Sequence, residues 1–518
     1  MQYEPVPHRR TKPCFTHRVP ALALLGCVLL AGCGGGDGSA GGSPPTYTIR
    51  ASITGLTTSG LSLALNGSTF PVDANSTSFI FPTQLATGST YAVTIQQQPT
   101  DEFCSVSDGS GTIGTTSVLV VLTCGLTLVH SFGSNPSDTI PASIIRGIDG
   151  NFYGVAQTGG ANGEYVKKIL LETPVFVFVP NAAGTLERIA PTGAVTILWN
   201  FGNDSTDGLN PSSVIEGRDG NFFGTTWGGG LYGAGGKHLG GTVFQLSPTG
   251  METVLWSFGN DPTRSWGPTS LIQATDGNLY GVTPVGGISR NLGDGESEWS
   301  GSVFKLTPQG VMTELWNFSA DGDGAGPTTL IQGADGNLYG TTNFGGTYAV
   351  GGGADTCGTV FKIALDGTET VLWSFSVTDG CDPNALVQGT DGNFYGTTHS
   401  ALGTVFRLSS TGVLTTLWSF GRDGAAGYYP TGLIEGTDGN FYGTTDAGGA
   451  YCDQRGCSVA RGGTLFRITP TGILTVLWSF GNGNDGNSPH GLIEGTDGRL
   501  YGITADGGAY GAGSLFRF

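Results

Sequence analysis

The chain has 518 residues, of which 92 are Gly and 25 are Pro; only 12% are charged, and the formal net charge is −18. Few charges together with 38% hydrophobic residues exclude a long disordered chain, and an acidic balance without a basic patch excludes nucleic-acid binding. The glycines lie inside alternating apolar stretches bounded by turn dipeptides, which excludes a collagen repeat.

Residues 1–32 have the layout of a secretory signal peptide. A basic flank precedes an apolar run over residues 19–30, and small residues follow. This order is typical of export signals. The following residue is Cys33, so the segment resembles the lipobox of bacterial lipoproteins, in which this Cys carries the lipid. The alternative is an ordinary cleaved signal peptide. The residues that carry the resemblance are Leu30, Ala31, Gly32 and Cys33.

Residues 33–45 are rich in Gly and Ser and are predicted to be a tether without a fold of its own. Gly34 rather than Asp follows the Cys. By analogy with lipoprotein sorting, this implies the outer membrane, on its periplasmic or its surface side. The resemblance therefore implies an exported protein that is attached to the cell envelope by an N-terminal lipid.

Residues 46–124 are predicted to form a small all-β module. Six apolar or alternating segments are separated by Gly, Asn, Asp and Ser, which is typical of short antiparallel strands in a sandwich. The module resembles the Ig-like spacers near the anchors of bacterial lipoproteins, so we interpret it as a stalk. The predicted strands cover residues 47–56, 61–72, 78–85, 91–97, 104–113 and 117–124.

Six cysteines remain beyond the signal peptide and Cys33. An even number in an exported protein predicts disulfides, although the sequence leaves their connectivity open. A metal site is the alternative, but no Cys-x-x-Cys pair or His lies at zinc-finger spacing. Chain order favours the pairs Cys104–Cys124, Cys357–Cys381 and Cys452–Cys457.

Residues 126–518 contain a unit that recurs seven times. Its surest element reads P-x-x-[ILV]-[IV]-x-[GA]-x-D-G-[NR]-[FL]-[FY]-G; a second reads G-[TS]-[VL]-[FE]-x-[LIF], and a third ends in L-W-[SN]-F. Self-similarity at this period indicates an array of supersecondary units. Each unit holds four predicted strands, joined in part by Asp-Gly and Pro-Thr-Gly-like turns that favour tight hairpins. The prolines of the first element are Pro141, Pro211, Pro268, Pro327, Pro383, Pro430 and Pro489.

Four-stranded sheets repeated radially make a β-propeller. The array ends on a third strand, residues 513–518, and begins on an unpaired fourth strand, residues 126–132. Pairing these two strands would complete the seventh blade and remove two open sheet edges. The predicted fold class is therefore all-β: a seven-bladed β-propeller over residues 126–518, preceded by the small Ig-like sandwich.

The motifs G-T-V-F, L-W-S-F and D-G-N-F-Y-G-T-T resemble the GloVer (Gloeobacter/Verrucomicrobia-type) tandem repeat of exported bacterial proteins. The resemblance covers residues 126–518 and implies a repeat architecture but no activity, since no function is tied to the repeat itself. The first unit departs most, with an insertion over residues 160–180 and with Glu187 where other units have Phe.

The long connections, between second and third strands and between fourth and first strands, are predicted to share one face, which we call the long-loop face. Binding residues concentrate on such loops above a rigid scaffold. Aromatic rings among Asn, Ser and Gly suit stacking on sugar rings, and the alternative is that they cover blade edges. The candidate ligand residues are Trp227, Tyr232, Trp266, Trp299, Tyr348, Tyr428, Tyr429, Tyr451 and His399.

No cofactor and no catalytic residue are predicted. Asp-rich loops such as residues 321–324 could bind calcium, but Asp beside Gly is foremost a turn former. His238, His399 and His490 could share the long-loop face, as in propeller lyases and hydrolases with His and acids near the axis. Each occurs once, however, and no G-x-S-x-G, H-E-x-x-H or phosphate loop stands out.

One position of the first strand is occupied by polar residues in all seven units. If this strand is innermost, these residues ring a central channel, where they could hold water or a cation. The other interpretation is that they form hydrogen bonds between blades. The seven residues are Arg146, Glu216, Gln273, Gln332, Gln388, Glu435 and Glu494.

The sequence as a whole predicts an exported, lipid-anchored and monomeric propeller that binds a glycan or a protein in the cell envelope. The membrane is a second partner, through the lipid. The alternatives are a propeller lyase or hydrolase with axial His and acidic residues, and a structural envelope protein without a small-molecule ligand.

Overall fold

The computed structural model is all-β in the part of the chain that it describes. Residues 46–518 form one compact unit. The predicted signal peptide, Cys33 and nearly all of the tether lie outside the described residues. Apart from the strands, the described part contains a short 3₁₀ helix, η1(Ser400–Leu402), and within it no helix has the length and apolar character needed to span a membrane. The described residues are 44–99, 102–107, 109–134, 139–161, 183–232, 240–260, 265–287, 289–291, 297–319, 322–347, 357–421, 424–451, 462–481 and 485–518.

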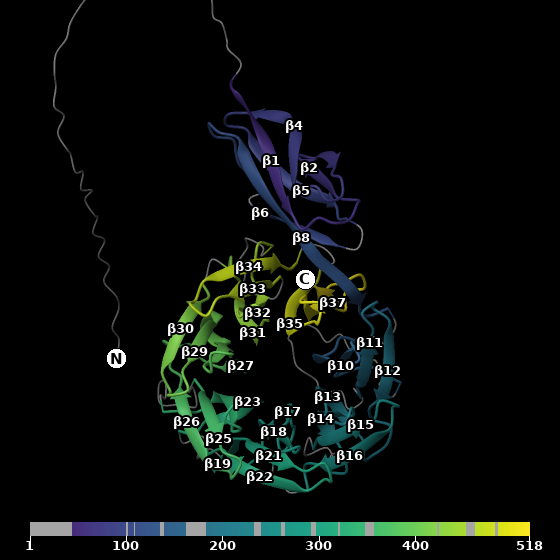
Figure 1. Ribbon diagram of the computed structural model, residues 1–518, viewed down its shortest axis with the longest axis vertical. Coiled ribbons are helices and arrows are strands. Elements are labelled where there is room, and N and C mark those ends of the chain that lie inside the picture. Colours follow the sequence, from purple (N-terminus) through teal and green to yellow (C-terminus); the bar gives the residue numbers. More distant parts are fainter. Residues whose placement is uncertain are drawn as a thin grey trace, which may run out of the picture. The chain divides into compact units, whose positions relative to one another are not determined.

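Two four-stranded sheets make up the N-terminal module (Figure 1). One sheet has the order β4-β1-β8-β6 and the other β3-β2-β5-β7. Ile49, Leu63, Phe81 and Val120, contributed by both sheets, are buried in one hydrophobic core. The strands are β1(Thr46–Thr54), β2(Ser62–Leu65), β3(Ser68–Pro71), β4(Ser78–Ala86), β5(Thr90–Gln97), β6(Phe103–Ser107), β7(Ser110–Thr112) and β8(Val118–Ser131).

Two of the predicted strands are in fact pairs of strands. Residues 61–72 form the hairpin β2–β3, in which Asn66 and Gly67 both have positive φ, 47° and 86°. Asn-Gly is a strong signal for a two-residue hairpin turn because both residues tolerate this conformation, so a single strand was the wrong prediction here. Residues 104–113 likewise divide into β6 and β7, which pair with different strands.

Strand β8 belongs to the module and to the repeat array at once. It covers 14 residues without a break, so the predicted boundary between residues 124 and 126 falls inside one strand. Its N-terminal half pairs with β1 and β6, and its C-terminal half pairs antiparallel with β37. The pairing with β37 supplies the fourth strand of the last sheet, as the phase of the repeat predicts.

The repeat array forms seven four-stranded sheets within the described residues, and we call them blades 1 to 7 in chain order. Each is antiparallel with the predicted strand order, and a hairpin, β19(Ser289–Asn291) and β20(Ser297–Trp299), lies between the second and third strands of blade 3. Blades 1 to 4 are β9(Ser143–Arg146), β10(Phe152–Ala156), β11(Thr185–Ile189), β12(Val195–Asn200); β13(Gly208–Glu216), β14(Phe222–Gly229), β15(Thr242–Leu246), β16(Glu252–Ser257); β17(Ser270–Gln273), β18(Leu279–Thr283), β21(Ser302–Leu306), β22(Met312–Asn317); and β23(Ala325–Gln332), β24(Leu338–Phe344), β25(Thr359–Ile363), β26(Glu369–Ser374). Blades 5 to 7 are β27(Pro383–Gln388), β28(Phe394–Thr398), β29(Thr404–Leu408), β30(Leu414–Ser419); β31(Tyr428–Glu435), β32(Phe441–Ala447), β33(Thr464–Ile468), β34(Leu474–Ser479); and β35(Asn487–Glu494), β36(Leu500–Asp506), β37(Ser514–Arg517) with β8.

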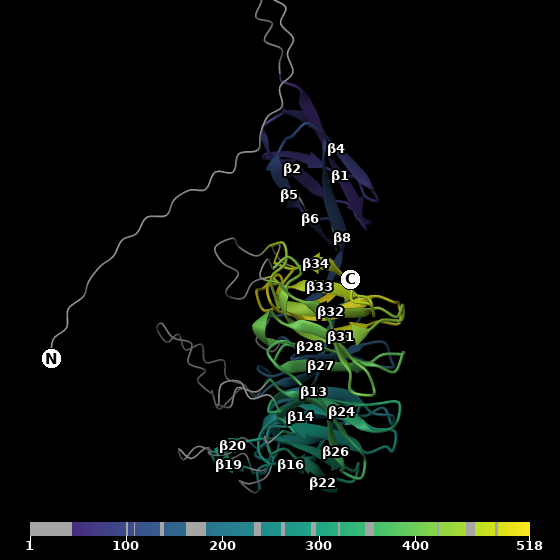
Figure 2. The same cartoon turned by 90° about the vertical axis from the view of Figure 1, so that its left-hand side faces the viewer.

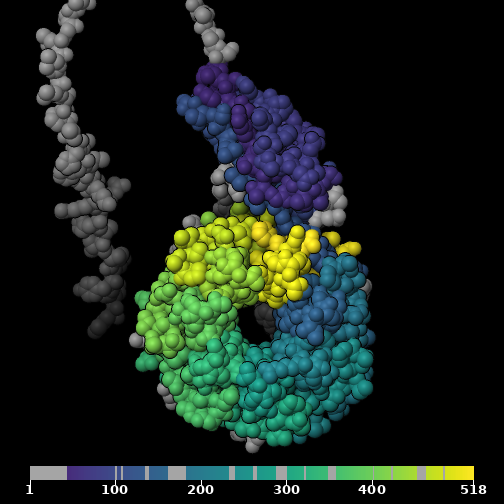
Figure 3. Space-filling view, viewed as in Figure 1, coloured from purple at the N-terminus to yellow at the C-terminus, as the bar shows by residue number. Residues whose placement is uncertain are grey.

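The blades are arranged like those of a propeller, with the first strands nearest the centre and the fourth strands outermost (Figure 1). Each first strand contacts the first strand of the next blade, and β35 contacts β9. Figure 3 shows the surface hollowed at the centre, and Figure 2 shows the blades from the side, with their connections on two opposite faces.

Aromatic side chains pack the blades against one another. Trp316 of blade 3 joins one hydrophobic cluster with Phe361 and Ile363 of blade 4, and the same arrangement recurs around the array. A Cβ at Gly281 would lie 2.4 Å from the ring of Phe304, so the glycine of the second strand makes room for the Phe of the third. The repeated Trp therefore has the packing role that its position predicts.

The polar residues of the first strands form hydrogen bonds between blades. Gln332 Oε1 accepts the backbone N–H of Thr275 at 2.8 Å, and the corresponding Glu or Gln of blades 2, 3, 5, 6 and 7 accepts the equivalent N–H of the preceding blade. Arg146 of blade 1 departs from this pattern and donates to Thr496 Oγ1 at 2.6 Å. The hydrogen-bonding interpretation of these residues is thus confirmed.

Candidate functional site

The long-loop face contains a pair of tryptophans from neighbouring blades. Trp227 lies near the end of β14, and Trp266 lies in the connection that leads to β17. Their ring centroids are 6.3 Å apart in an edge-to-face arrangement, and both side chains are half-buried. A Cβ at Gly267 would lie 3.1 Å from the ring of Trp227, so the glycine lets the chain pass close to the indole. The sequence placed both residues among the candidates, and the structure brings them together.

A second aromatic group lies at the boundary of blades 5 and 6. The ring of Tyr429 stacks on that of His399 at 5.1 Å, and the buried Tyr428 lies perpendicular to Tyr429 at the same centroid distance. Tyr429 has a φ of 60°, which is uncommon for an aromatic residue and costs free energy. The backbone N–H of His399 donates to the backbone oxygen of Asp382, and the Ser400 hydroxyl donates to the Asp382 carboxylate.

The other candidates are dispersed. Tyr232 is exposed, whereas the hydroxyl of Tyr451 accepts the backbone N–H of Val106 in β6 at 3.3 Å. Burial raises the pKa of Tyr451, consistent with a ring that covers protein surface. The side chain of Trp299 and all of Tyr348 lie outside the described residues, as does His238.

Two of the three predicted disulfides are present. Cys104 and Cys124 link β6 to β8, and Cys357–Cys381 joins two connections of the long-loop face. Cys452 and Cys457 lie outside the described residues.

His490 is a half-buried residue of β35. Burial lowers its pKa, although a contact of Nδ1 with the backbone oxygen of Ser488, at 3.1 Å, acts in the opposite direction.

The carboxylates of Asp-rich connections accept hydrogen bonds from the chain itself. Asp323 accepts the Trp316 indole N–H at 3.3 Å and the Ser319 N–H, and Asp485 accepts the Trp478 indole N–H at 3.1 Å. The described residues hold no group of three or more His, Cys, Asp or Glu that could bind a metal ion. These contacts are those of turn and cap formers.

Three acidic residues that were not among the predicted site residues occupy repeat positions where the other blades have mostly apolar residues. They are Glu252, Glu314 and Glu369. Burial, with the nearby carboxylates of Asp207 and Asp204, raises the pKa of Glu252 to about 8. Burial raises that of Glu369 to about 7, with Asp323 adding to the effect. A carboxylate at an apolar position of a repeat was the signal in the sequence that could have found them.

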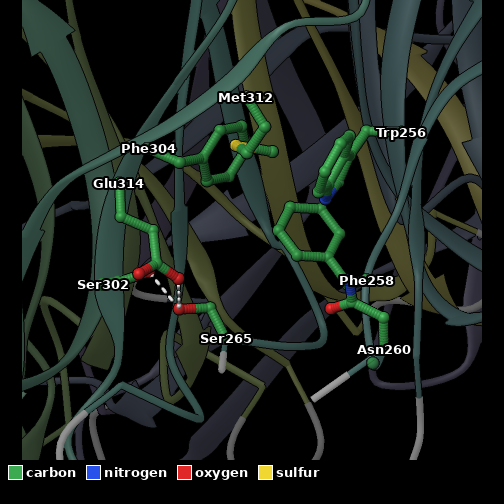
Figure 4. A pocket seen from close by; sticks show the side chains of 9 residues that line it. Trp256, Phe258, Asn260, Ser265, Ser302, Phe304, Met312 and Glu314 are labelled. Atoms are coloured by element: carbon green, nitrogen blue, oxygen red, sulfur yellow. Dashed lines mark hydrogen bonds between the residues drawn. The ribbon is translucent and has the colours of Figure 1, made fainter. Parts of the chain in front are cut away.

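A cavity of about 110 Å³ lies where blade 3 faces the outer strand of blade 2 (Figure 4). Glu314, Ser265 and Ser302 lie on one side of it, and the rings of Trp256 and Phe258 on the other. The Ser265 hydroxyl lies 3.4 Å from Glu314 Oε1 and also contacts the hydroxyl of Ser302. The remaining lining residues are Gly259, Asn260, Phe304 and Met312.

The chain belongs to the Gloeobacter/Verrucomicrobia repeat family, whose model matches residues 179–352 and 348–518. No curated protein matches the sequence.

Two solved structures with a similar fold are only distantly related in sequence. One is described as the extracellular domain of a hybrid two-component system of B. thetaiotaomicron, with 11% identity and a TM-score of 0.44; the match covers 81% of this chain and 44% of that one. Another is a gluconolactonase of Xanthomonas campestris, with 12% identity and a TM-score of 0.35, covering 59% of this chain and 84% of the other. Neither likeness is close enough to carry an argument about function.

Proposed function

We propose that the protein is an exported binding module of the cell envelope, with a seven-bladed propeller as its scaffold and a ligand surface on the long-loop face. The observation that carries this proposal is the Trp227–Trp266 pair. Two half-buried indoles from adjacent blades present flat apolar area at a fixed angle, which suits a sugar ring or an apolar side chain of a protein.

The scaffold is proposed to be a closed ring. Three contacts support it. The pairing of β37 with β8 completes the last blade with a strand that precedes the first blade in the chain, and the contact of β35 with β9 and the hydrogen bond between Arg146 and Thr496 join the last blade to the first. The N-terminal sandwich is proposed as an Ig-like stalk, and Cys33 as the lipidated residue that attaches the protein to the outer membrane.

Binding rather than catalysis is proposed, with a glycan or a protein as partner and the monomer as the working form. In the described part of the chain, the ring of His399 stacks on that of Tyr429 at 5.1 Å, and its backbone N–H donates to the backbone oxygen of Asp382 at 2.9 Å. That arrangement favours stacking over proton transfer, which needs a partner within hydrogen-bond reach.

The test is a glycan array with the full chain, followed by titration of any hit against Trp227→Ala and Trp266→Ala. We expect saturable binding that each substitution weakens at least tenfold. Ile148→Ala is the matched control, since this side chain is 90% exposed in an Asp-Gly turn on the other face. Binding that survives both tryptophan substitutions, with circular dichroism unchanged, would contradict the proposed surface.

A further inference from the structure

Two departures from the repeat coincide at the cavity between blades 2 and 3. The first is Ser265, which stands three residues before the blade proline, where five other blades have Gly. A Cβ at those glycines would lie between 2.1 and 2.4 Å from a threonine side chain, so in those blades a serine would require the threonine to move. The corresponding glycines are Gly208, Gly324, Gly380, Gly427 and Gly486.

Blade 3 keeps the register of the other blades around this serine. Strand β17 begins at Ser270, and the isolated bridge between Trp266 and Val285 is equivalent to the pair Leu209–Gly228 of blade 2. The Ser265 side chain is buried and contacts the hydroxyl of Ser302. The space that lies beside this segment is the cavity.

The second departure is Glu314 of β22, which pairs with Phe304 of β21. Glu314 is exposed to solvent, and it lines the cavity. Its carboxylate oxygens make long contacts, 3.4 Å to the Ser265 hydroxyl and 3.4 Å to the amide nitrogen of Asn317. The equivalent residues of the other blades are uncharged: Leu128, Ile197, Val254, Val371, Thr416 and Val476.

We propose that this cavity binds a primary alkylammonium group. The carboxylate of Glu314 and the hydroxyl of Ser265 meet the ammonium, while Trp256, Phe258 and Met312 enclose the alkyl chain. Aromatic rings and a carboxylate on opposite walls favour an organic cation over an anion or a neutral polar group. The volume sets the size, because about 150 Å³ is enough for benzene and 110 Å³ leaves room for a few heavy atoms.

A free amine and a lysine side chain of a peptide share this chemistry. The probes are therefore n-butylammonium, its neutral isostere n-butanol, and N-acetyl-lysine methylamide, each titrated into the full chain by calorimetry and ligand-observed NMR. We expect butylammonium to bind at least tenfold more tightly than butanol. Tighter binding of the lysine derivative than of butylammonium assigns the site to peptides, and the reverse order assigns it to free amines.

Glu314→Gln should weaken butylammonium binding at least tenfold and leave butanol unchanged. Glu314→Val is a second variant, which restores the residue type of blades 2, 4 and 6 and should fold at least as well. Asp506→Asn, which removes an exposed carboxylate elsewhere, is the matched control. The proposal is overturned if the cation does not bind saturably, or if Glu314→Gln binds it as the wild type does. Trp227→Ala should leave amine binding intact, so this site and the proposed ligand surface fail separately.

Discussion

The hydrogen bonds between first strands give a quantitative prediction for the stability of the blade array. Gln332 accepts the N–H of Thr275 at 2.8 Å, and its amide donates to Thr275 Oγ1 at 3.1 Å and to the Gly336 backbone oxygen at 2.9 Å. Gln332→Ala removes all three bonds. A neutral hydrogen bond contributes about 0.5–1.5 kcal/mol net, and these are partly open to water, so we expect a loss of about 1.5–3 kcal/mol.

The local consequence is sharper than the global one. The Thr275 amide loses its acceptor, so its hydrogen exchange should accelerate at least tenfold, which corresponds to about 1.4 kcal/mol. Amides of β26, the outermost strand of blade 4, should change less. Gln332→Glu keeps an acceptor for the Thr275 N–H, just as Glu435 of blade 6 accepts the N–H of Thr390 in blade 5. This variant should therefore preserve the slow exchange of the Thr275 amide.

The measurements are hydrogen exchange followed by mass spectrometry and urea unfolding followed by circular dichroism. Gln245→Ala, a Gln in a third strand, controls for the effect of Ala on a strand. If Gln332→Ala and Gln245→Ala shift the urea midpoint equally and Thr275 exchange does not change, the inter-blade bond contributes nothing, and the reasoning is refuted.

Three further predictions concern the contact between the last and the first blade, the carboxyl group of Glu252 and the disulfide Cys357–Cys381. Arg146→Gln would place an acceptor opposite the backbone N–H of Thr496, as in the other blades, and should raise stability by about 0.5–1 kcal/mol in urea unfolding; a loss would show that the arginine is the better link. The pKa of Glu252 is raised from about 4.5 to about 8, so the fold favours the protonated form and loses stability as pH rises through this window. Glu252→Gln should therefore unfold at the same temperature as the wild type near pH 4.5 and at a higher temperature than the wild type at pH 8. Equal melting temperatures of the variant and the wild type at both pH values would contradict this. Replacing Cys357 and Cys381 by Ser opens a loop with a sequence separation of 24 and should cost about 2–4 kcal/mol, measured against the oxidised wild type; unchanged melting under reducing conditions would argue against it.

Much of the fold could be predicted from the sequence because its determinants are local and repeated. Alternating strands, Asp-Gly turns and the recurring Trp each act within one unit, and seven copies average out local exceptions. The phase of the array, which begins on a fourth strand and ends on a third, predicted the pairing of β8 with β37. Where a local signal was passed over, as at Asn66-Gly67, the prediction failed locally and nowhere else.

The candidate site was predicted less well because it depends on contacts between units. The sequence marked Trp227 and Trp266, but it gave Tyr451 the same weight, and only the fold shows that its hydroxyl meets the backbone of β6. The raised pKa of Glu252 depends on burial and on Asp207, which lies in the connection before β13, 45 residues earlier in the chain.

The sequence alone determined the architecture: the repeat, the strand order, the turns and the chemistry of each position. Tertiary structure decided which exceptions to the repeat matter. Ser265 and Glu314 are 49 residues apart, and neither is informative alone. They form one wall of a cavity because the fold brings the residue three positions before the blade proline next to the outer strand of the same blade, where Glu314 replaces the uncharged residue of the other blades.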